Sequence, residues 1–135
     1  RTYLETLNRP YQLEDVERIA KGQIDLIYQY RNRPLVFFDT CLFILKVWFK
    51  EVYQTVPDWL EREIPLIGKG IYLLCEPDLP WQYDPLRENP TRRDYLNKQY
   101  EEELQKAGFS YFRVSGNETA RTQNAIEIIN RMLIC

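Results

Sequence analysis

The chain has 135 residues and a formal net charge of −2, so it fits a single domain with a real core and offers no strong basic field to nucleic acid or an anionic membrane. It contains no histidine, which excludes Ser-His and Cys-His nucleophilic catalysis and most zinc sites within these residues. Three widely spaced cysteines, no membrane-spanning apolar run and no visible signal peptide together indicate a cytoplasmic protein.

The first half of the chain predicts helices around one strand. Apolar residues recur at helical spacing over 13–30, which predicts an amphipathic helix. The run LVFFDT at 35–40 is continuously apolar before its aspartate, which is typical of a strand buried on both faces of a parallel sheet. A helix over 41–53 follows, and Pro57 and Pro65 are expected to open and to limit a shorter one.

The second half predicts two more strands and two more helices. Residues 70–78 and 110–116 have the pattern of buried strands. Between them, the stretch 91–94 looks like a capping box for a helix that ends before Gly108. Asn117 is expected to cap the final helix. Three apolar residues of that helix are expected to face inward: Ile126, Ile129 and Leu133.

Strands that alternate with helices predict an α/β fold, and we expect one domain over 1–135 as a three-layer sandwich with a mainly parallel sheet. Ligands of such sheets bind at the carboxyl ends of the strands. Asp39 and Asp78 each follow a predicted strand, where a carboxylate can orient Mg²⁺, directly or through water, or accept a substrate proton. Two structural alternatives stay open: Asp39 caps the next helix, and Asp78 belongs to an Asp-Leu-Pro turn.

The stretch PDLPWQYDPLRENPTRRDYL at 77–96 combines aromatic residues, prolines and arginines. Arg87, Arg92 and Arg93 lie on a loop that enters a helix, and guanidinium groups suit phosphate because they are planar, always charged and bidentate. Two cations at a helix N-terminus oppose its macrodipole, which favours a functional role over a solvated helix start. We therefore predict a phosphate-closing lid over about 79–94.

Three further side chains have two interpretations each. Trp81 can stack on a flat, cationic ring, or it can pin the loop to the core. Asp84 can bind sugar hydroxyls, or it can pair with Arg87. Gln23 falls on the apolar stripe of the first predicted helix, so its amide needs either a ligand or a backbone partner, and a backbone partner is the simpler interpretation.

A phosphate lid usually closes on a Gly-x-x-x-x-Gly-Lys-Ser/Thr loop. Of the five glycines, only Gly68 is followed by lysine. That Lys69 is followed by another glycine, and Glu63 stands where the first glycine of the motif belongs. These residues therefore contain no P-loop, and they could not form an intact phosphate-transferring enzyme of this kind by themselves.

Several stretches resemble the ribosylnicotinamide-kinase-like (NadR-type) P-loop ATPase/kinase family, which is linked to NAD metabolism. The resemblance covers nearly the whole chain, and its part around 80–93 is fairly specific. Its carriers are RTYLE at 1–5, IAKGQ at 19–23, LVFFDT at 35–40, LLCEPDLPWQYDPLRENPTRRDYL at 73–96 and VSGNETAR at 114–121.

The resemblance implies a P-loop kinase-like fold that uses ATP and Mg²⁺. Asp39 then belongs to a Walker-B-like strand as a catalytic and metal-orienting residue, and Arg87 and Arg93 are lid arginines. An acceptor pocket and a loop beside adenine are also implied, formed by Gln23, Trp81 and Asp84 and by Ser115, Gly116 and Asn117 respectively. Family members begin with a strand, the P-loop, a helix and a second strand, so we expect the chain to be an N-terminally incomplete domain.

The function expected of the complete protein is ATP-dependent phosphoryl transfer to a small nucleoside-like acceptor, with nicotinamide riboside as the first candidate. These 135 residues by themselves are expected to be inactive. The alternatives are a non-catalytic nucleotide- or NAD-binding sensor module and a general ATPase. We expect neither nucleic acid nor a membrane as a partner, and the sequence does not indicate an oligomeric state.

Overall fold

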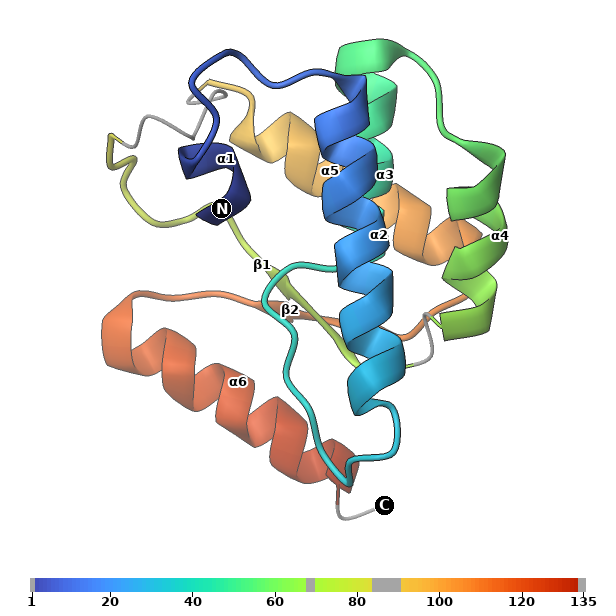
Figure 1. Cartoon of the computed structure of the whole chain (residues 1–135). Coiled ribbons are helices and arrows are strands. Elements are labelled where there is room, and N and C mark those ends of the chain that lie inside the picture. Colours follow the sequence, from blue (N-terminus) through green and yellow to red (C-terminus); the bar gives the residue numbers. More distant parts are fainter. Residues whose placement is uncertain (1, 68–69, 84–90, 134–135) are drawn as a thin grey trace. The chain divides into compact units, whose positions relative to one another are not determined.

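The computed structural model describes residues 2–67, 70–83 and 91–133, which belong to two compact units that divide the chain after residue 69 (Figure 1). The described part of the first unit is helical, and the second unit contains a small parallel sheet with helices. The α/β class with parallel strands is therefore confirmed in its coarse form, whereas the three-layer sandwich and the single domain over 1–135 stay predictions. No helix among the described residues is long and apolar enough to cross a membrane.

The first unit is built on three helices that pack against one another. They are α2 (Leu13–Tyr30), α3 (Leu42–Trp48), which continues into the π-helix η1 (Phe49–Tyr53), and α4 (Asp58–Ile67). The predicted helices over 13–30 and 41–53 are thus confirmed. The buried apolar residues of this unit come from all of these elements: Val16, Ala20, Ile24, Leu42, Phe43, Leu45, Val47, Phe49, Leu60 and Ile64.

An acidic side chain fixes the start of α2. Asp15 is only 3% exposed, and its carboxylate accepts hydrogen bonds from Arg9 Nη1 at 2.6 Å and from the Tyr3 hydroxyl at 2.6 Å. It also accepts the backbone N–H of Gln12 at 2.8 Å, which completes a reciprocal cap of the helix. The short helix α1 (Thr2–Glu5) is thereby tied to α2 through a buried, fully paired charge.

We expect the stability of the first unit to fall in acid because of Asp15. The hydrogen bonds from Arg9, from Tyr3 and from the backbone of Gln12 hold the pKa of Asp15 well below its ordinary value of 3.8. A carboxyl whose pKa is lower in the folded state stabilises the fold above its ordinary pKa, and this contribution is lost as the pH falls below that value. Thermal unfolding followed from pH 6 to pH 2 measures the loss.

The matched pair for this prediction is Asp15→Asn and Asp25→Asn, the same chemical change at a buried and at an exposed position of α2. Asp15→Asn is expected to lower Tm at neutral pH and to flatten the acid dependence of Tm. Asp25→Asn is expected to leave the dependence as it is in the unmodified protein. An equally steep acid dependence in Asp15→Asn would contradict the assignment of the acid-labile contribution to this carboxylate.

The strand predicted over 35–40 is wrong. Residues 35–38 form neither helix nor strand, and Leu35, Phe37 and Phe38 are 51%, 67% and 41% exposed. A strand exists only where a second strand satisfies its backbone groups, and no described residue pairs with this segment. An apolar run indicates the preference for burial, but it does not supply the partner.

Two helix boundaries also differ from the predictions. α4 continues past Pro65 to Ile67, because a proline near the end of a helix removes few hydrogen bonds. Pro57 precedes the helix, and its carbonyl accepts the first amide hydrogen bonds of α4. The capping box predicted at 91–94 does not form, since α5 (Arg93–Lys106) has Arg92 at its N-cap and no side-chain cap there.

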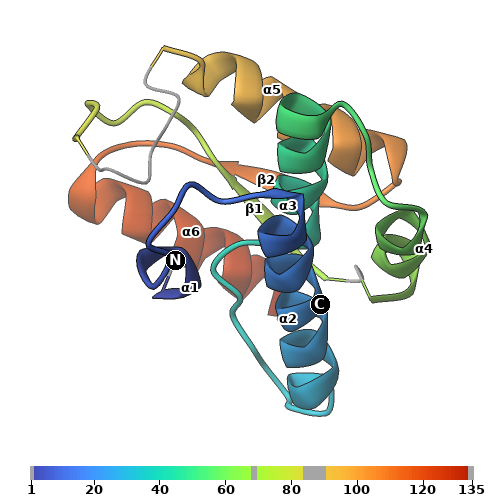
Figure 2. The same ribbon diagram turned by 45° about the horizontal axis from the view of Figure 1, so that its top comes forward.

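The second unit is a strand–helix–strand–helix arrangement. The strands β1 (Tyr72–Cys75) and β2 (Tyr111–Val114) pair in parallel with Tyr72 opposite Tyr111, and α5 connects them. α5 contacts β1, and α6 (Glu118–Leu133) contacts β2; Figures 1 and 2 show the two helices on opposite sides of the strand pair. Strands are confirmed within 70–78 and 110–116, but they are shorter than predicted, and only Leu74 and Val114 in them are buried. With Leu104 of α5, these are the buried apolar residues described in this unit.

The ends of both helices follow from local chemistry. Gly108 has φ +72°, a left-handed conformation that glycine adopts at low cost, and its N–H and that of Phe109 donate back to Gln105 and Leu104. The predicted end of α5 at this glycine is therefore confirmed. α6 begins directly after Asn117, as predicted, and the Asn117 carbonyl accepts the Arg121 N–H.

The inward face predicted for α6 is partly wrong. Ile126 and Leu133 are 43% and 55% exposed, whereas Ile129 is half-buried. The face that turns inward carries Arg121, Ala125 and Ile128, which recur at spacings of four and three along the helix. Arg121 fixes this rotation because its side chain reaches Glu76 and Asp78 after β1 and Gly116 after β2, so Ile126 and Leu133 lie off the covered face.

Candidate functional site

The carboxyl ends of β1 and β2 are joined by one carboxylate. Asp78, just after β1, accepts the Gly116 N–H at 2.6 Å and Arg121 Nη1 at 2.5 Å. The Gly116 N–H and then the Arg121 guanidinium hold the pKa of Asp78 below its ordinary value. Its carboxylate thus connects the loop after β1 to the loop after β2, a role that neither the turn nor the metal interpretation of this aspartate includes.

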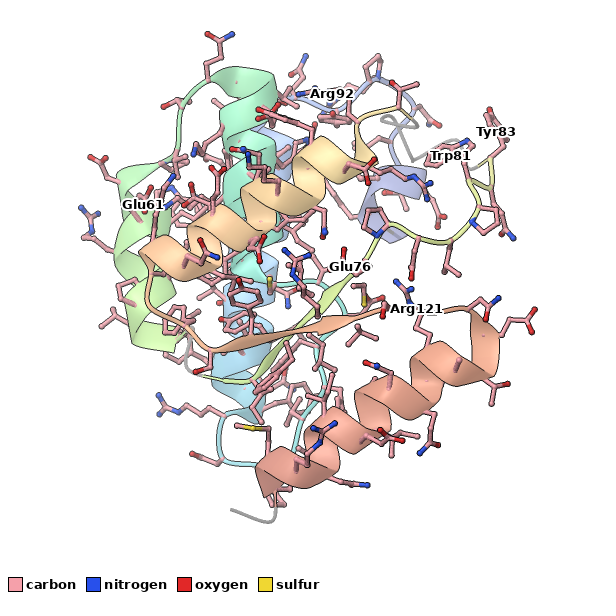
Figure 3. The ribbon with its side chains drawn as sticks, turned by 180° about the vertical axis from the view of Figure 1, so that it is seen from behind. Glu61, Glu76, Trp81, Tyr83, Arg92 and Arg121 are labelled. Atoms are coloured by element: carbon pink, nitrogen blue, oxygen red, sulfur yellow. The ribbon has the colours of Figure 1, made fainter. Side chains whose placement is uncertain are left out.

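Arg121 was not among the predicted site residues, although it contacts both strand ends. Its Nη1 donates to the Gly116 carbonyl at 2.9 Å, and its Nη2 donates to the Glu76 carbonyl at 2.6 Å. Figure 3 shows its side chain extending from α6 toward the strand ends. The only sequence signal was its position as the last residue of the VSGNETAR stretch, because its partners on the β1 side, Asp78 and Glu76, lie more than forty residues away in the chain.

The predicted adenine loop, Ser115 to Asn117, lies at this edge of the sheet. Gly116 has φ +96°, a conformation that other residues adopt only with strain, and both its N–H and its carbonyl are hydrogen-bonded. The loop is therefore held in one shape by the Asp78–Arg121 pair. Its contact with adenine stays a prediction.

Two of the predicted site residues meet on the segment after β1. Arg93 Nη1 donates to the Leu79 carbonyl at 2.7 Å, and its guanidinium carbon lies 6.0 Å from the centre of the Trp81 ring. Arg93 thereby joins the two ends of the predicted lid, and it faces an aromatic surface that Figure 3 places on the segment beyond β1. Asp84 and Arg87 lie outside the described residues.

The remaining predicted residues belong to the first unit. Gln23 is half-buried, and its amide donates to the Thr40 carbonyl at 3.2 Å, which is the backbone partner that one interpretation anticipated. Thr40 has φ +84° and directly follows Asp39, which is exposed. The N-cap of α3 is Cys41, so the interpretation of Asp39 as a helix cap is wrong. Asp39 also follows an irregular segment and not a strand.

A second polar network covers the α5 side of the strands. Arg113 pairs with both Glu76 and Glu101, Asn97 donates to Glu76 at 3.2 Å, and the Tyr111 hydroxyl donates to Glu101 at 2.5 Å. The hydrogen bond from Tyr111, together with Arg113, lowers the pKa of Glu101. Both acids are thus committed to holding β1, β2 and α5 together, and neither is available as a general base.

The described residues offer few carboxylates to a bound magnesium ion. In residues 2–67, 70–83 and 91–133, no group of three or more metal-binding side chains could hold an ion. Magnesium is often bound through one or two carboxylates, water and substrate phosphates, so the exposed Asp39 fits a contact of this limited kind. A cradle for the phosphates themselves would need a P-loop, and the 135 residues contain none.

Open α/β sheets bind their ligands at the carboxyl ends of the strands, and the Asp78–Arg121 pair lies at this edge of the strand pair. A family model of the AAA domain matches residues 2–121, and the chain belongs to this family. AAA domains are P-loop NTPase-like, so the chain is assigned to a class associated with nucleotide binding and ATPase-like activity. No curated protein and no solved structure matches the chain.

Membership in the AAA domain family agrees with the P-loop part of the resemblance described above. It does not extend to the ribosylnicotinamide-kinase branch, so the kinase activity, the acceptor and the link to NAD metabolism belong to the proposal that follows.

Proposed function

We propose that the complete protein transfers the γ-phosphoryl group of ATP, in the presence of magnesium, to a small nucleoside-like acceptor in the cytoplasm. Nicotinamide riboside is the first acceptor to test. The observation that carries the proposal is the pair formed by Arg93 and Trp81, which sets a permanent cation next to an aromatic face on the segment after β1. One side chain suits a transferring phosphate and the other suits a flat acceptor ring.

Arg93 would neutralise charge that develops on the phosphoryl group, and Arg87 would do so with it. Trp81 would stack on the acceptor base, while Asp84 would bind the hydroxyls of its sugar. Catalysis of this kind relies on positioning and electrostatics, so the lack of histidine in the chain is no obstacle.

Asp39 and Gln23 also have roles in the proposal. The hydrogen bond from Gln23 to the Thr40 carbonyl steadies the turn that follows Asp39. Asp39, which is exposed, would orient magnesium through water or accept the proton of the acceptor hydroxyl. Gln23 would also border the acceptor, and Ser115, Gly116 and Asn117 would lie beside adenine.

A second function has one observation in its favour. The 135 residues contain no Gly-x-x-x-x-Gly-Lys-Ser/Thr motif, which is the usual source of the lysine that contacts the transferred phosphate. A sensor that binds ATP or NAD without turnover needs the base and ribose contacts but not this lysine.

One assay distinguishes the two functions. ATP consumption by the full-length protein is measured with magnesium, first without acceptor and then with nicotinamide riboside, adenosine or uridine at equal concentration. The kinase predicts turnover that rises severalfold with one nucleoside and a product heavier by one phosphoryl group. Equal ATP consumption with and without every acceptor would indicate a general ATPase. Saturable ATP or NAD binding without turnover would indicate the sensor.

A further inference from the structure

The Asp78–Arg121 pair differs from an ordinary surface ion pair. The Arg121 side chain is 17% exposed and the Asp78 side chain is 37% exposed, so both are partly withdrawn from water. Exposed ion pairs contribute little to stability, because the charges are screened and two flexible side chains must be ordered. Besides its own ion pair, this pair is held by three backbone contacts: the Gly116 N–H donates to Asp78, and the Arg121 guanidinium donates to the Gly116 and Glu76 carbonyls.

Two of these contacts converge on Gly116 in the loop after β2, and a third reaches the end of β1. The Asp78 carboxylate accepts the Gly116 N–H. The Arg121 guanidinium donates to the Gly116 carbonyl and to the Glu76 carbonyl at the end of β1. The two backbone groups of Gly116 are therefore fixed by side chains from the loop after β1 and from α6. Because Gly116 has φ +96°, a free loop would sample other conformations easily, and the pair selects one of them.

A loop fixed in this way is useful for recognising a flat, rigid ligand. Binding to a loop that is already ordered avoids the entropy that an ordering step would cost, so affinity depends on how well the loop is held before the ligand arrives. The loop follows the carboxyl end of a parallel strand, where open α/β sheets bind their ligands. The phosphates of a nucleotide need a separate, charged cradle, so loss of the loop's shape should affect the base and not the phosphates.

We propose that Asp78 and Arg121 are positioning residues that hold the 115–117 loop in the shape that receives the base of a nucleoside triphosphate. This inference rests on the nucleotide binding in the proposed function. It adds two residues to the site and assigns recognition of the base to the 115–117 loop, separately from binding of the phosphates. Asp78 and Arg121 act through the Gly116 backbone and do not touch the ligand themselves. The preference of the protein for one nucleotide base over another therefore depends on the Asp78–Arg121 pair, which supports the 115–117 loop.

The test compares two ligands that share phosphates but differ in the base. Dissociation constants of ATP and of inorganic tripolyphosphate are measured by calorimetry, with magnesium, for the full-length protein and for Arg121→Ala, Arg121→Lys and Asp78→Asn. We expect Arg121→Ala to raise the Kd of ATP roughly tenfold or more and to leave the Kd of tripolyphosphate within about twofold. Arg121→Lys keeps the charge but cannot form the same fork, so a partial loss for ATP is expected.

Arg131→Ala is the matched control, because Arg131 is an exposed arginine of the same helix whose guanidinium contacts only its own turn among the described residues. Arg131→Ala should change neither the Kd of ATP nor the Kd of tripolyphosphate. If the pair has a purely structural role, its loss should weaken the binding of both ligands and lower Tm in parallel. Equal losses of affinity for ATP and tripolyphosphate in a folded variant would overturn the inference. If Arg121→Ala does not fold, Asp78→Asn and Arg121→Lys give the same comparison.

The control measurement on the unmodified protein separates this inference from the proposed function. If the unmodified protein binds ATP and tripolyphosphate, equal losses in the variants overturn only the role of the pair. If it binds neither ligand, nucleotide binding itself fails, and the role assigned to Asp78 and Arg121 fails with it. A changed ratio of ATP to GTP affinity in Arg121→Lys would support the inference further, since a scaffold role alone does not alter base preference.

Discussion

Replacing Arg93 with alanine in the full-length protein is expected to lower the rate of phosphoryl transfer by roughly a hundredfold or more. A preorganised cation that meets charge developing in the transition state contributes on this scale. The kcat with saturating ATP and acceptor measures the effect. Arg92→Ala is the matched control, because it removes the same charge from the neighbouring residue, whose guanidinium lies 4.8 Å from the Tyr95 ring.

Stability should change little in the same variant. Among the described residues, Arg93 donates one hydrogen bond to the Leu79 carbonyl and faces the Trp81 ring, and both contacts are partly solvent-exposed. Together they are worth about 1 kcal/mol. An unchanged kcat in Arg93→Ala, or equal losses in Arg92→Ala and Arg93→Ala, would show that Arg93 does not meet the transferred phosphoryl group.

Leu60→Ala is expected to destabilise the first unit by about 2–5 kcal/mol. Leu60 is 0% exposed on α4, a helix that packs against α2 and α3, so truncating its side chain leaves a cavity that the neighbouring helices cannot close completely. Leu66→Ala is the matched control on the same helix, because Leu66 is 67% exposed and the same truncation there should change stability by no more than about 0.5 kcal/mol. Urea unfolding at constant pH measures both values.

This pair also tests the orientation of α4. Both residues are leucines in one helix, so differences in helix propensity cancel between the two variants. Similar losses of stability in Leu60→Ala and Leu66→Ala would mean that α4 is covered on both sides, in contradiction to the exposed face described here.

Local sequence patterns predicted secondary structure correctly where a segment contains its own backbone hydrogen-bond partners. The helix over 13–30 was predicted with its correct bounds, because helical hydrogen bonds form within the segment and the apolar stripe alone indicates the buried face. The run at 35–40 has an equally clear apolar pattern, yet a strand depends on a second strand that the pattern does not contain. Phe37 is therefore the most exposed of its apolar residues.

The candidate site shows the same limit on a larger scale. Trp81 and Arg93 could be associated from sequence because they belong to one stretch of chain, and Gly116 was recognisable as a loop glycine. Arg121 could not be associated with Asp78, since 43 residues separate them and only the parallel pairing of β1 with β2 brings them together. Charge and spacing identify candidate side chains, whereas topology decides which of them meet.

The unequal cores of the two units have a consequence for local opening. Among the described residues, ten buried apolar side chains lie in the first unit and three in the second, which depends more on the ion pairs of Arg113 and Arg121. Salt weakens such pairs far more than it weakens apolar packing. Amide hydrogens of β1 and β2 should therefore exchange with solvent through an opening that needs less free energy and is more sensitive to salt than the opening of the middle of α2. The second unit is expected to be the first cooperative unit to lose protection.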